Sequence, residues 1–518
     1  MAAAVALVRR GCRPTVLDAG LTPDQNALSL KSRLASAESE DWKEDELESV
    51  RQTGPVAANG IPRKLYFGSD FAFRAVNVAT PLELQQASVH RSFAAGGFSN
   101  VWGAVIQALP GRELMEWPVS SGELSPHYDA VRVLLCDGPE GGGGTVETPA
   151  APRALPQALH PSSQARGLYA DLSAGRQQLE RAGFQFEYPQ LAVRADESNG
   201  RKGCRYCGLC LYGCPYDCRY TAEVTLRRLI RAGLISYEPG MVVERISLEQ
   251  GQIRVDCRVL PDGSSRTFRA RKILLAAGLL ETTRIVLSSL RLYDTPLHVL
   301  HSDIFTLPLL RYHPDRAVFH EKMHTLCQLV AKIEDDLICA HPVHLQFYGF
   351  SDLYRRLLAL KLGWASYPLA PALRAAAARL FVIFGYLHSS VSSSLTLTLS
   401  TGGGLKLHIK GQSNPEAERI SRAVAGKLLL HRGCLRAMPV SLRPHLDLPG
   451  GGYHSGGVFP MRARPQSLET DRLGRLALLP GVHIVDASVL PTIPACPMAF
   501  TVMANAHRIA SECPVPHV

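Results

Sequence analysis

The sequence predicts an α/β fold in which a layer of parallel strands and helices is interrupted by a β-rich region and completed by the C-terminus. Three observations lead to this prediction. The chain opens on a helix followed by a short strand that ends in an acid, "PTVLDAG" at 14–20. A second strand, glycine and helix follow at 271–290, and successive strand-like segments fill 303–410. Strands that alternate with helices are typical of a parallel sheet, whereas consecutive strands indicate an antiparallel one.

The length, composition and charge of the chain restrict the class of protein that it can be. At 518 residues, with 46% hydrophobic and 20% charged residues, the chain has room for several globular domains. Its net charge of +10 is scattered, and no basic run is interleaved with aromatic residues, so we expect no nucleic-acid partner. We identify no transmembrane segment. The N-terminus lacks a signal-peptide layout, because Arg9, Arg10 and Gly11 follow the apolar run, and we expect a cytoplasmic protein.

The opening helix and strand predict the second half of a dinucleotide-binding βαβ unit. Apolar residues recur at helical spacing from Ala3 to Val8, and Asp18 closes the strand, where a carboxylate accepts hydrogen bonds from ribose hydroxyls. A turn or capping aspartate is the alternative. The strand and G-x-G-x-x-G turn that open such a unit would stand before Met1. We expect a start-site error or a truncated gene model there rather than an evolved loss.

A glycine-rich loop, "AAGGFSNVWGA" at 94–104, is a second candidate cofactor contact. Gly96 and Gly97 allow the backbone to approach a ligand closely, and Ser99 and Asn100 supply donors for phosphate or ring edges. A glycine-rich surface turn is the alternative, but Trp102 and its aliphatic neighbours argue against a purely exposed loop.

Five of the thirteen cysteines lie close together. Cys204, Cys207, Cys210 and Cys214 have the spacing C-x₂-C-x₂-C-x₃-C-P of a bacterial ferredoxin run, and thiolates are ligands for iron–sulfur clusters or zinc. Cys218 adds a fifth thiol, which also permits a zinc site or two disulfides. A packed cap without any metal stays open as well.

His454 is the candidate catalytic residue. It lies in the loop "GGGYHSGG", and an imidazole poised near neutral pH can remove the hydroxyl proton of an alcohol. An exposed loop histidine without a catalytic role is the alternative.

These motifs, in this order, resemble those of the glucose–methanol–choline (GMC) family of flavin-dependent oxidoreductases. The resemblance implies an FAD-binding Rossmann-like domain, here N-terminally truncated, that an antiparallel-sheet substrate domain interrupts. It rests on Asp18 in "VLDAG", the loop 94–104, "WPVSSGELSPHYD" (117–129), "ILLAAGLLETTRIVL" (273–287), and "YHSGGVFPM" with "VHIVDASVLPTIPACPMAFTVMANAHRIA" (453–461 and 482–510).

The resemblance also implies further cofactor contacts. Val243 falls where the family has an adenine-contacting valine, and Ala277 and Gly278 end the second nucleotide-contacting strand. Asp486 and Ala487 open the turn that meets the pyrophosphate. The implied segments are the first part of the FAD-binding domain (1–136), a linker and excursion (137–200), the second part with the cysteine-rich insert (201–290), the substrate domain (291–449) and the completing segment (450–518).

The implied activity is FAD-dependent oxidation of the CH–OH group of an alcohol, sugar or sterol-like substrate, with His454 as general base. Some dehydrogenases of the family carry an iron–sulfur cluster beside the flavin, which would pass electrons to a carrier protein or quinone. A dehydrogenase is therefore favoured over an oxidase, and without a cluster oxygen stays open as the electron acceptor. One position departs from the family, because Pro497 stands where a second histidine or an asparagine binds the substrate oxygen, and proline has no side-chain donor.

Two other classes of protein stay open at this point. A truncated or non-catalytic relic that keeps the fold would explain both Pro497 and the phosphate loop that does not precede Met1. A metal- or redox-sensing module centred on 204–218 is the other alternative.

Overall fold

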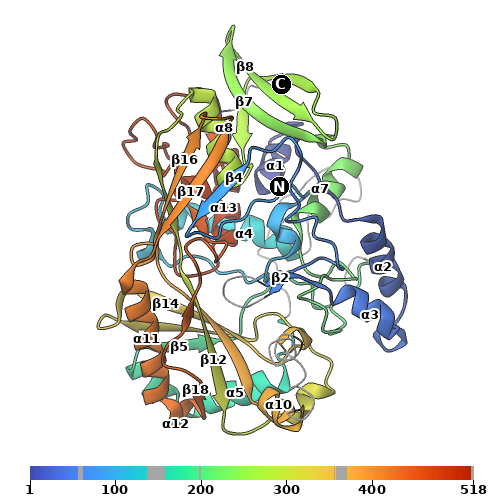
Figure 1. Cartoon of the computed structure of the whole chain (residues 1–518), viewed down its shortest axis with the longest axis vertical. Helices are drawn as coiled ribbons and strands as arrows, with labels where there is room; N and C mark the ends of the chain where they lie inside the picture. The colour runs from blue at the N-terminus through green and yellow to red at the C-terminus, as the bar shows by residue number, and fades with distance from the viewer. Residues whose placement is uncertain (57–61, 137–157, 198–199, 355, 357–369, 515–518) are drawn as a thin grey trace.

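The computed structural model describes residues 1–56, 62–136, 158–197, 200–354, 356 and 370–514. Two lobes are visible in Figure 1, with the first helix and the long hairpin in the upper lobe and a large sheet with its helices in the lower lobe. The Gly- and Pro-rich linker that the sequence predicts at 137–156 lies outside the described residues, as does most of a helical excursion that the sequence predicts at 353–362. The predicted domain boundaries stay predictions.

The upper lobe contains the parallel strands that the sequence predicts. Helix α1 (Ala2–Arg9) leads into β1 (Thr15–Leu17), which pairs in parallel with β6 (Ser236–Glu238). Strand β10 (Ile273–Leu275) pairs in parallel with β21 (Val482–Ile484). Among the described residues these are two separate pairs of strands. The expectation that a strand preceding Met1 is missing stays a prediction.

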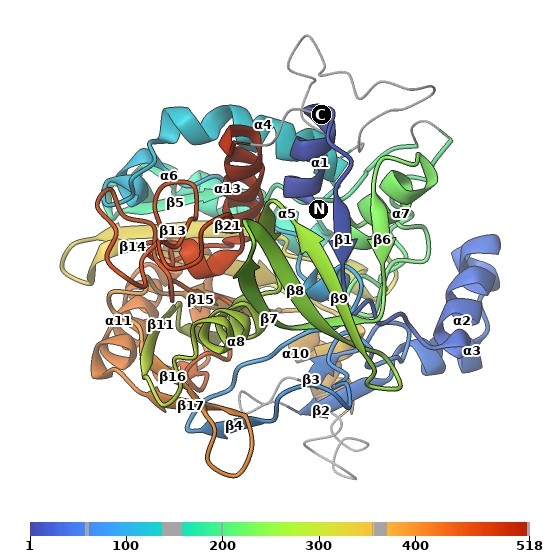
Figure 2. The same ribbon diagram turned by 90° about the horizontal axis from the view of Figure 1, so that it is seen from above.

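Three antiparallel strands accompany this layer. Strands β7 (Met241–Glu249) and β8 (Gln252–Val259) form the hairpin predicted around 249–252, and β9 (Ser265–Ala270) pairs with β8. Helix α8 (Leu279–Leu290) follows β10, as predicted, and the chain closes on α13 (Ala499–Glu512). Ala6 and Leu7 of α1 share a buried cluster with Ala510 of α13, and the two helices lie side by side in Figure 2.

The lower lobe is built on a seven-stranded antiparallel sheet. Its main path runs β18-β12-β15-β14-β13-β5, and β19 also pairs with β12. The strands are β5 (Phe184–Glu187), β12 (Ile304–Arg311), β13 (Leu329–Asp335), β14 (Cys339–Tyr348), β15 (Leu380–Tyr386), β18 (Ala437–Pro439) and β19 (His445–Leu446). Strands predicted within 303–410 are thus present, and the antiparallel character of the interrupting region is confirmed.

The two faces of this sheet differ in chemistry, because neighbouring residues of a strand point to opposite faces. Leu345 and Ile383 belong to a buried cluster with residues of α5 (Ser163–Ala174) and α11 (Pro415–Leu430), two helices of the lower lobe in Figure 1. On the opposite face the register aligns one row of three polar residues across β13, β14 and β15. This row consists of Lys332, His344 and Tyr386.

A second sheet of five strands corrects one detail of the prediction. The sequence predicts one antiparallel sheet for all strands of 303–410, but the last two of these strands belong to a different sheet. These two strands pair with strands from other parts of the chain. The residue pattern of a strand does not predict which strand it pairs with. The sheet has the order β20 (Ser455–Gly456), β11 (Leu297–His301), β16 (Ser394–Ser400), β17 (Lys406–Gln412) and β4 (Leu82–Gln85), with β17 and β4 parallel.

Shorter elements surround the two lobes. None of the described helices is long and apolar enough to cross a membrane. Strands β2 (Thr53–Val56) and β3 (Pro62–Lys64) form a small hairpin. The remaining α-helices are α2 (Gln25–Ser36), α3 (Glu44–Val50), α4 (Ser121–Cys136), α6 (Arg176–Arg181), α7 (Ala222–Arg231), α10 (Ala370–Ala377) and α12 (Arg432–Leu435).

Candidate functional site

Asp18 lies directly after β1, at the edge where the glycine-rich loop meets the parallel strands. Its carboxylate accepts hydrogen bonds from the Tyr237 hydroxyl (3.2 Å) and from the backbone N–H of Gly20 (3.2 Å). Burial raises the pKa of Asp18, although both hydrogen bonds oppose this rise. The N–H of Ala95 donates to the carbonyl of Leu21 (2.9 Å), so the loop and the strand end are neighbours, as a shared cofactor site requires.

The two loop glycines have conformations that favour glycine. Gly96 has φ 82° and Gly97 has φ 56°, both in the left-handed region. A Cβ on Gly96 would lie 2.9 Å from the backbone nitrogen of Glu223, whereas a Cβ on Gly97 would meet no atom within 4 Å. Gly96 is therefore required by close packing, and Gly97 leaves open space beside the backbone that a ligand can enter.

The other predicted loop donors bind protein groups. The Ser99 hydroxyl donates to the carbonyl of Gly96 and accepts from the N–H of Ala222 (2.9 Å) at the start of α7. The Asn100 amide donates to two carbonyls within the loop, and the Trp102 indole donates to the carbonyl of Tyr220 (2.9 Å). These side chains fix the shape of the loop, and their contact with a cofactor stays a prediction.

The Asp486 carboxylate joins the two other predicted cofactor turns. One of its oxygens accepts from the N–H of Gly278 (3.0 Å) and from the Thr282 hydroxyl (2.5 Å) at the start of α8. The other accepts from the N–H of Ser488 (2.9 Å). The turns after β10 and β21, which carry Ala277 and Ala487, are thereby held together. A Cβ on Gly278, which has φ 81°, would meet no atom within 4 Å, so this turn also borders open space.

Val243 lies in the same region as these turns. It packs with Leu17 of β1 and Ile273 of β10 in one apolar cluster, and its neighbour Met241 donates its N–H to the carbonyl of Asp18 (2.9 Å). Val243 is thus close to the predicted ribose-binding acid, but its packing is equally that of a core residue.

The loop that carries His454 is fixed against the Asp486 turn. The carbonyl of His454 accepts from the N–H of Ser302 (3.0 Å), and the next two residues form β20, which pairs with β11. The N–H of Gly457 donates to the carbonyl of Ala487 (3.0 Å). The predicted base and the predicted pyrophosphate turn are therefore neighbours, although 33 positions separate them in sequence.

The His454 imidazole faces the polar side of the seven-stranded sheet. Its ring stacks on Tyr386, with centroids 5.1 Å apart and an interplanar angle of 23°. Its Nδ1 atom is buried and has no hydrogen-bond partner in the described part of the chain. Burial lowers the pKa of His454 to about 4, so the ring is neutral at physiological pH and free to accept a proton.

His344 and Gln346 of this polar face were not found from the sequence. His344 lies opposite Tyr386 in the register of β14 and β15, and its Nε2 atom is buried without a partner among the described residues. The Gln346 carbonyl oxygen accepts from the Tyr348 hydroxyl (3.0 Å). The alternation in "HPVHLQFYGF" was the available signal, but it does not reveal which face is turned towards His454.

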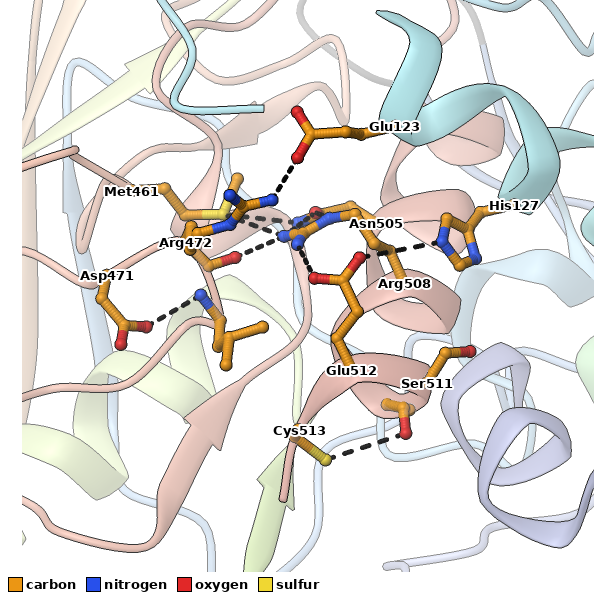
Figure 3. Close-up of polar contacts among 12 residues, drawn as sticks. Glu123, His127, Met461, Asp471, Arg472, Asn505, Arg508, Ser511, Glu512 and Cys513 are labelled. Carbon is orange, nitrogen blue, oxygen red and sulfur yellow. Dashed lines mark hydrogen bonds and ion pairs between the residues drawn. The ribbon is translucent and has the colours of Figure 1, made fainter. Parts of the chain in front are cut away.

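A buried arginine anchors the closing helix α13. The Arg508 guanidinium donates to the Glu512 carboxylate (2.9 Å), to the Asn505 carbonyl oxygen and to the backbone carbonyl of Arg472, and it lies beside the Met461 sulfur (Figure 3). Its side chain is fully buried. This network ties α13 to the segment that follows the His454 loop, so it positions both.

The predicted cysteine motif lines one cavity. Arg219, next in sequence after the last of these cysteines, donates to the carbonyls of Asn100 (2.6 Å) and Trp102 (2.6 Å). The cavity therefore adjoins the glycine-rich loop. The five cysteines that line it are Cys204, Cys207, Cys210, Cys214 and Cys218.

The five thiols can be compared with the two alternatives of disulfide bonds and a single zinc ion. All five are free, so the two disulfides considered from the sequence are absent from the structure. Zinc binds each sulfur at about 2.3 Å, which requires the four sulfurs to lie within about 4 Å of one another. Among the described residues the cysteines do not form a group with all ligand atoms within 4.8 Å. The observed spread is wider than a single zinc ion needs.

Glu113, His341 and His388 do have ligand atoms within 4.8 Å of one another. The two imidazole rings stack face to face, however, with centroids 3.7 Å apart and an interplanar angle of 13°. Stacked rings direct their nitrogen lone pairs side by side rather than towards one point. We therefore infer no metal site from this group.

The buried histidines give a prediction about stability. Burial is the main cause that lowers the pKa of His324, His454 and His507 to about 4 and that of His344 and His388 to about 3, from an ordinary value of 6.5. Below pH 6.5 the unfolded chain binds protons that the folded chain does not. Stability is then lost as pH falls from 6.5 to 4, by up to about 1.4 kcal/mol per pH unit for each such ring.

Melting temperatures at pH 7.5, 6.5, 5.5 and 4.5 check this expectation. A steady fall below pH 6.5 is expected, and a constant melting temperature down to pH 4.5 would contradict it.

The structure has the features of the fold class that the resemblance implied. These are turns after parallel strands, an antiparallel sheet that interrupts the parallel layer, and a loop histidine between the two. Among solved structures, the chain is similar to pyridoxine 4-oxidase from Mesorbium loti, with a TM-score of 0.59 and 16% sequence identity over 99% of this chain and 96% of that chain. This similarity confirms the predicted fold. No family model matches the sequence, and no curated protein matches it.

Proposed function

We propose that the protein is an FAD-dependent oxidoreductase that oxidises a CH–OH group. One observation carries the proposal: a neutral imidazole, His454, is held between the Ala487 turn and the polar face of a sheet, with a buried nitrogen that lacks a partner. Buried polar groups normally have hydrogen-bond partners, so a ring nitrogen without one is suited to a ligand proton. The fold shared with pyridoxine 4-oxidase supports an alcohol as the substrate.

The turns at the strand ends fit FAD. Gly97 and Gly278 border open space, where a pyrophosphate can come close to the backbone, and Asp18 retains acceptor capacity for ribose hydroxyls. These residues would hold the nucleotide. When bound, FAD supplies a hydride acceptor.

The chain's own residues would carry the proton chemistry. His454 accepts the hydroxyl proton while the carbinol hydrogen leaves as hydride, so the C–OH carbon becomes a carbonyl. The stacked Tyr386 ring keeps the imidazole in one orientation. The sheet face and the His454 loop together limit access of water, which keeps the base neutral and desolvated.

We further propose that the cysteine cavity holds an iron–sulfur cluster that accepts electrons and makes the protein a dehydrogenase. The ferredoxin spacing and the free thiols that line one cavity support a cluster. The two hydrogen bonds from Arg219 join this cavity to the glycine-rich loop, which supports a cluster close to the proposed flavin. A carrier protein or quinone would then take the electrons, and the location in the cell stays a prediction.

Replacement of Cys207 by serine tests the cluster. Protein purified without oxygen is expected to contain iron and sulfide, and Cys207→Ser is expected to lose most of both, because a serine hydroxyl is a poor ligand for iron–sulfur clusters. Cys257→Ser is the matched control, since Cys257 is buried in β8 away from the cavity. Metal analysis that finds zinc, or no metal, in the wild type would refute the cluster.

Reconstitution with FAD tests the function itself. The protein is expected to take up FAD and, with an artificial electron acceptor, to oxidise at least one member of a panel of primary alcohols that includes pyridoxine and benzyl alcohol. A chain that takes up no FAD would support the alternative of a non-catalytic relic. Bound zinc without flavin would support a metal-sensing module instead.

A further inference from the structure

The proposed reaction needs a second polar group at the substrate oxygen. As the hydroxyl proton leaves, negative charge develops on that oxygen, and a fixed hydrogen-bond donor stabilises it. The C-terminal loop supplies no such side chain at Pro497, because proline has no donor. The neighbouring Cys496 is buried, and burial raises the pKa of its thiol to about 12, so it stays protonated and is only a weak donor.

His344 is the described residue that best replaces this missing donor. It extends from the centre of β14 on the polar face of the seven-stranded sheet, and its register partner on β15 is Tyr386, the residue on which His454 stacks. The rings of His344 and Tyr386 lie 5.9 Å apart at 55°. One tyrosine ring therefore lies next to both imidazoles, one from the seven-stranded sheet and the other from the loop that precedes β20.

The hydrogen bonding of His344 also indicates a ligand. Only 3% of the residue is exposed, and its Nε2 atom is buried without a partner in the described part of the chain. An unpaired buried donor or acceptor is costly in the empty protein, and this cost is removed when a ligand group pairs with it. Nδ1 of His454 is likewise buried without a partner among the described residues.

Two neutral imidazoles match the hydrogen-bonding needs of an alcohol. A hydroxyl group donates one proton and accepts hydrogen bonds through its oxygen. One ring can accept the hydroxyl proton while the N–H of the other ring donates to the oxygen.

We propose that His344 binds the substrate hydroxyl oxygen and donates to it as His454 removes the proton, in place of the side chain that Pro497 lacks. The inference rests on the proposed function and specifies its second polar group. In the step, the O–H bond breaks and its proton goes to His454, while the carbinol C–H bond breaks and its electron pair leaves with the hydrogen as hydride, for which FAD, when bound, would be the acceptor. The hydrogen bond from His344 is kept and strengthens as the C=O bond forms.

Replacement of His344 by leucine and by glutamine tests this role. With pyridoxine or benzyl alcohol as substrate, His344→Leu is expected to lower kcat about 100-fold, as for the loss of one donor to a developing oxyanion. His344→Gln keeps an N–H donor, so its kcat is expected to stay within about 10-fold of the wild-type value. The dependence of kcat/KM on the ionisation of His454 is expected to remain in both variants. His408→Gln, at a partly exposed position of β17 in the other sheet, is the control.

A comparison of ligands with and without the hydroxyl tests the role of His344 separately from the proposed oxidoreductase function. Calorimetry with pyridoxine against 4-deoxypyridoxine, and benzyl alcohol against toluene, is expected to show that His344→Leu weakens binding of the alcohols only. This result can be obtained even if the wild type binds an alcohol without oxidising it, which would refute the proposed function alone. Equal loss of rate in the leucine and glutamine variants, or equal weakening for alcohol and deoxy analogue, would overturn the role of His344.

Discussion

Replacement of His454 by glutamine is expected to lower the rate of flavin reduction by an alcohol by roughly 10²–10⁴-fold, the usual contribution of a general base. The physical reason is the position of the ring, which stacks on Tyr386 with a buried, unpartnered nitrogen next to the Ala487 turn. Glutamine preserves much of the side-chain volume but cannot take up a proton. Rapid-mixing measurements of flavin absorbance check the rate.

The control for this variant is the FAD content. Because the backbone of His454, and not its ring, makes the hydrogen bond to Ser302, the loop is expected to keep its conformation and the protein its flavin. A glutamine variant with full FAD content and a rate within a few-fold of the wild type would show that His454 is not the base.

Replacement of Arg508 by methionine is expected to cost roughly 2–4 kcal/mol of folding free energy. Methionine preserves length and apolar volume, but the Asn505 side chain and the Arg472 carbonyl lose their shared donor in a fully buried position. The remaining partner, Glu512, is partly exposed and can be rehydrated, which keeps the cost below that of a fully buried ion pair. Thermal unfolding of the variant, followed by circular dichroism, measures the loss.

Arg432→Met is the matched control for this prediction. Arg432 lies exposed at the start of α12, where its guanidinium donates only to the carbonyl of Leu429, so its replacement is expected to change stability by less than about 0.5 kcal/mol. Equal melting temperatures of the Arg508 and Arg432 variants would show that the network in Figure 3 does not anchor α13.

The fold could be predicted from the sequence where a strand and a helix follow one another as a parallel α/β unit. The helix and strand before Asp18, and the strand, glycine and helix around Gly278, have a periodicity that only parallel α/β units share. The pairing of the later strands could not be predicted, because alternation fixes which face a residue takes but not which strand lies beside it. For this reason the sequence predicts that β16 and β17 lie in the same sheet as the other strands of 303–410, which is wrong.

The site was predictable to the extent that it depends on loops. His454 and the turn at Asp486 stood out because glycine-rich and polar segments are unusual next to buried strands. His344 was missed because a histidine inside an alternating strand is ordinary, and only the register with Tyr386 brings it to His454. Arg219 was missed for a similar reason, since its two hydrogen bonds reach residues more than 100 positions away.

Anaerobic mixing of the FAD-loaded protein with an alcohol tests the central claim most directly. With benzyl alcohol or pyridoxine as the trial substrate, the account predicts that the flavin absorbance bleaches, and that it bleaches more slowly when the carbinol carbon carries deuterium, because the C–H bond breaks in that step. A fully FAD-loaded protein whose flavin stays oxidised with every primary and secondary alcohol tried would contradict the account.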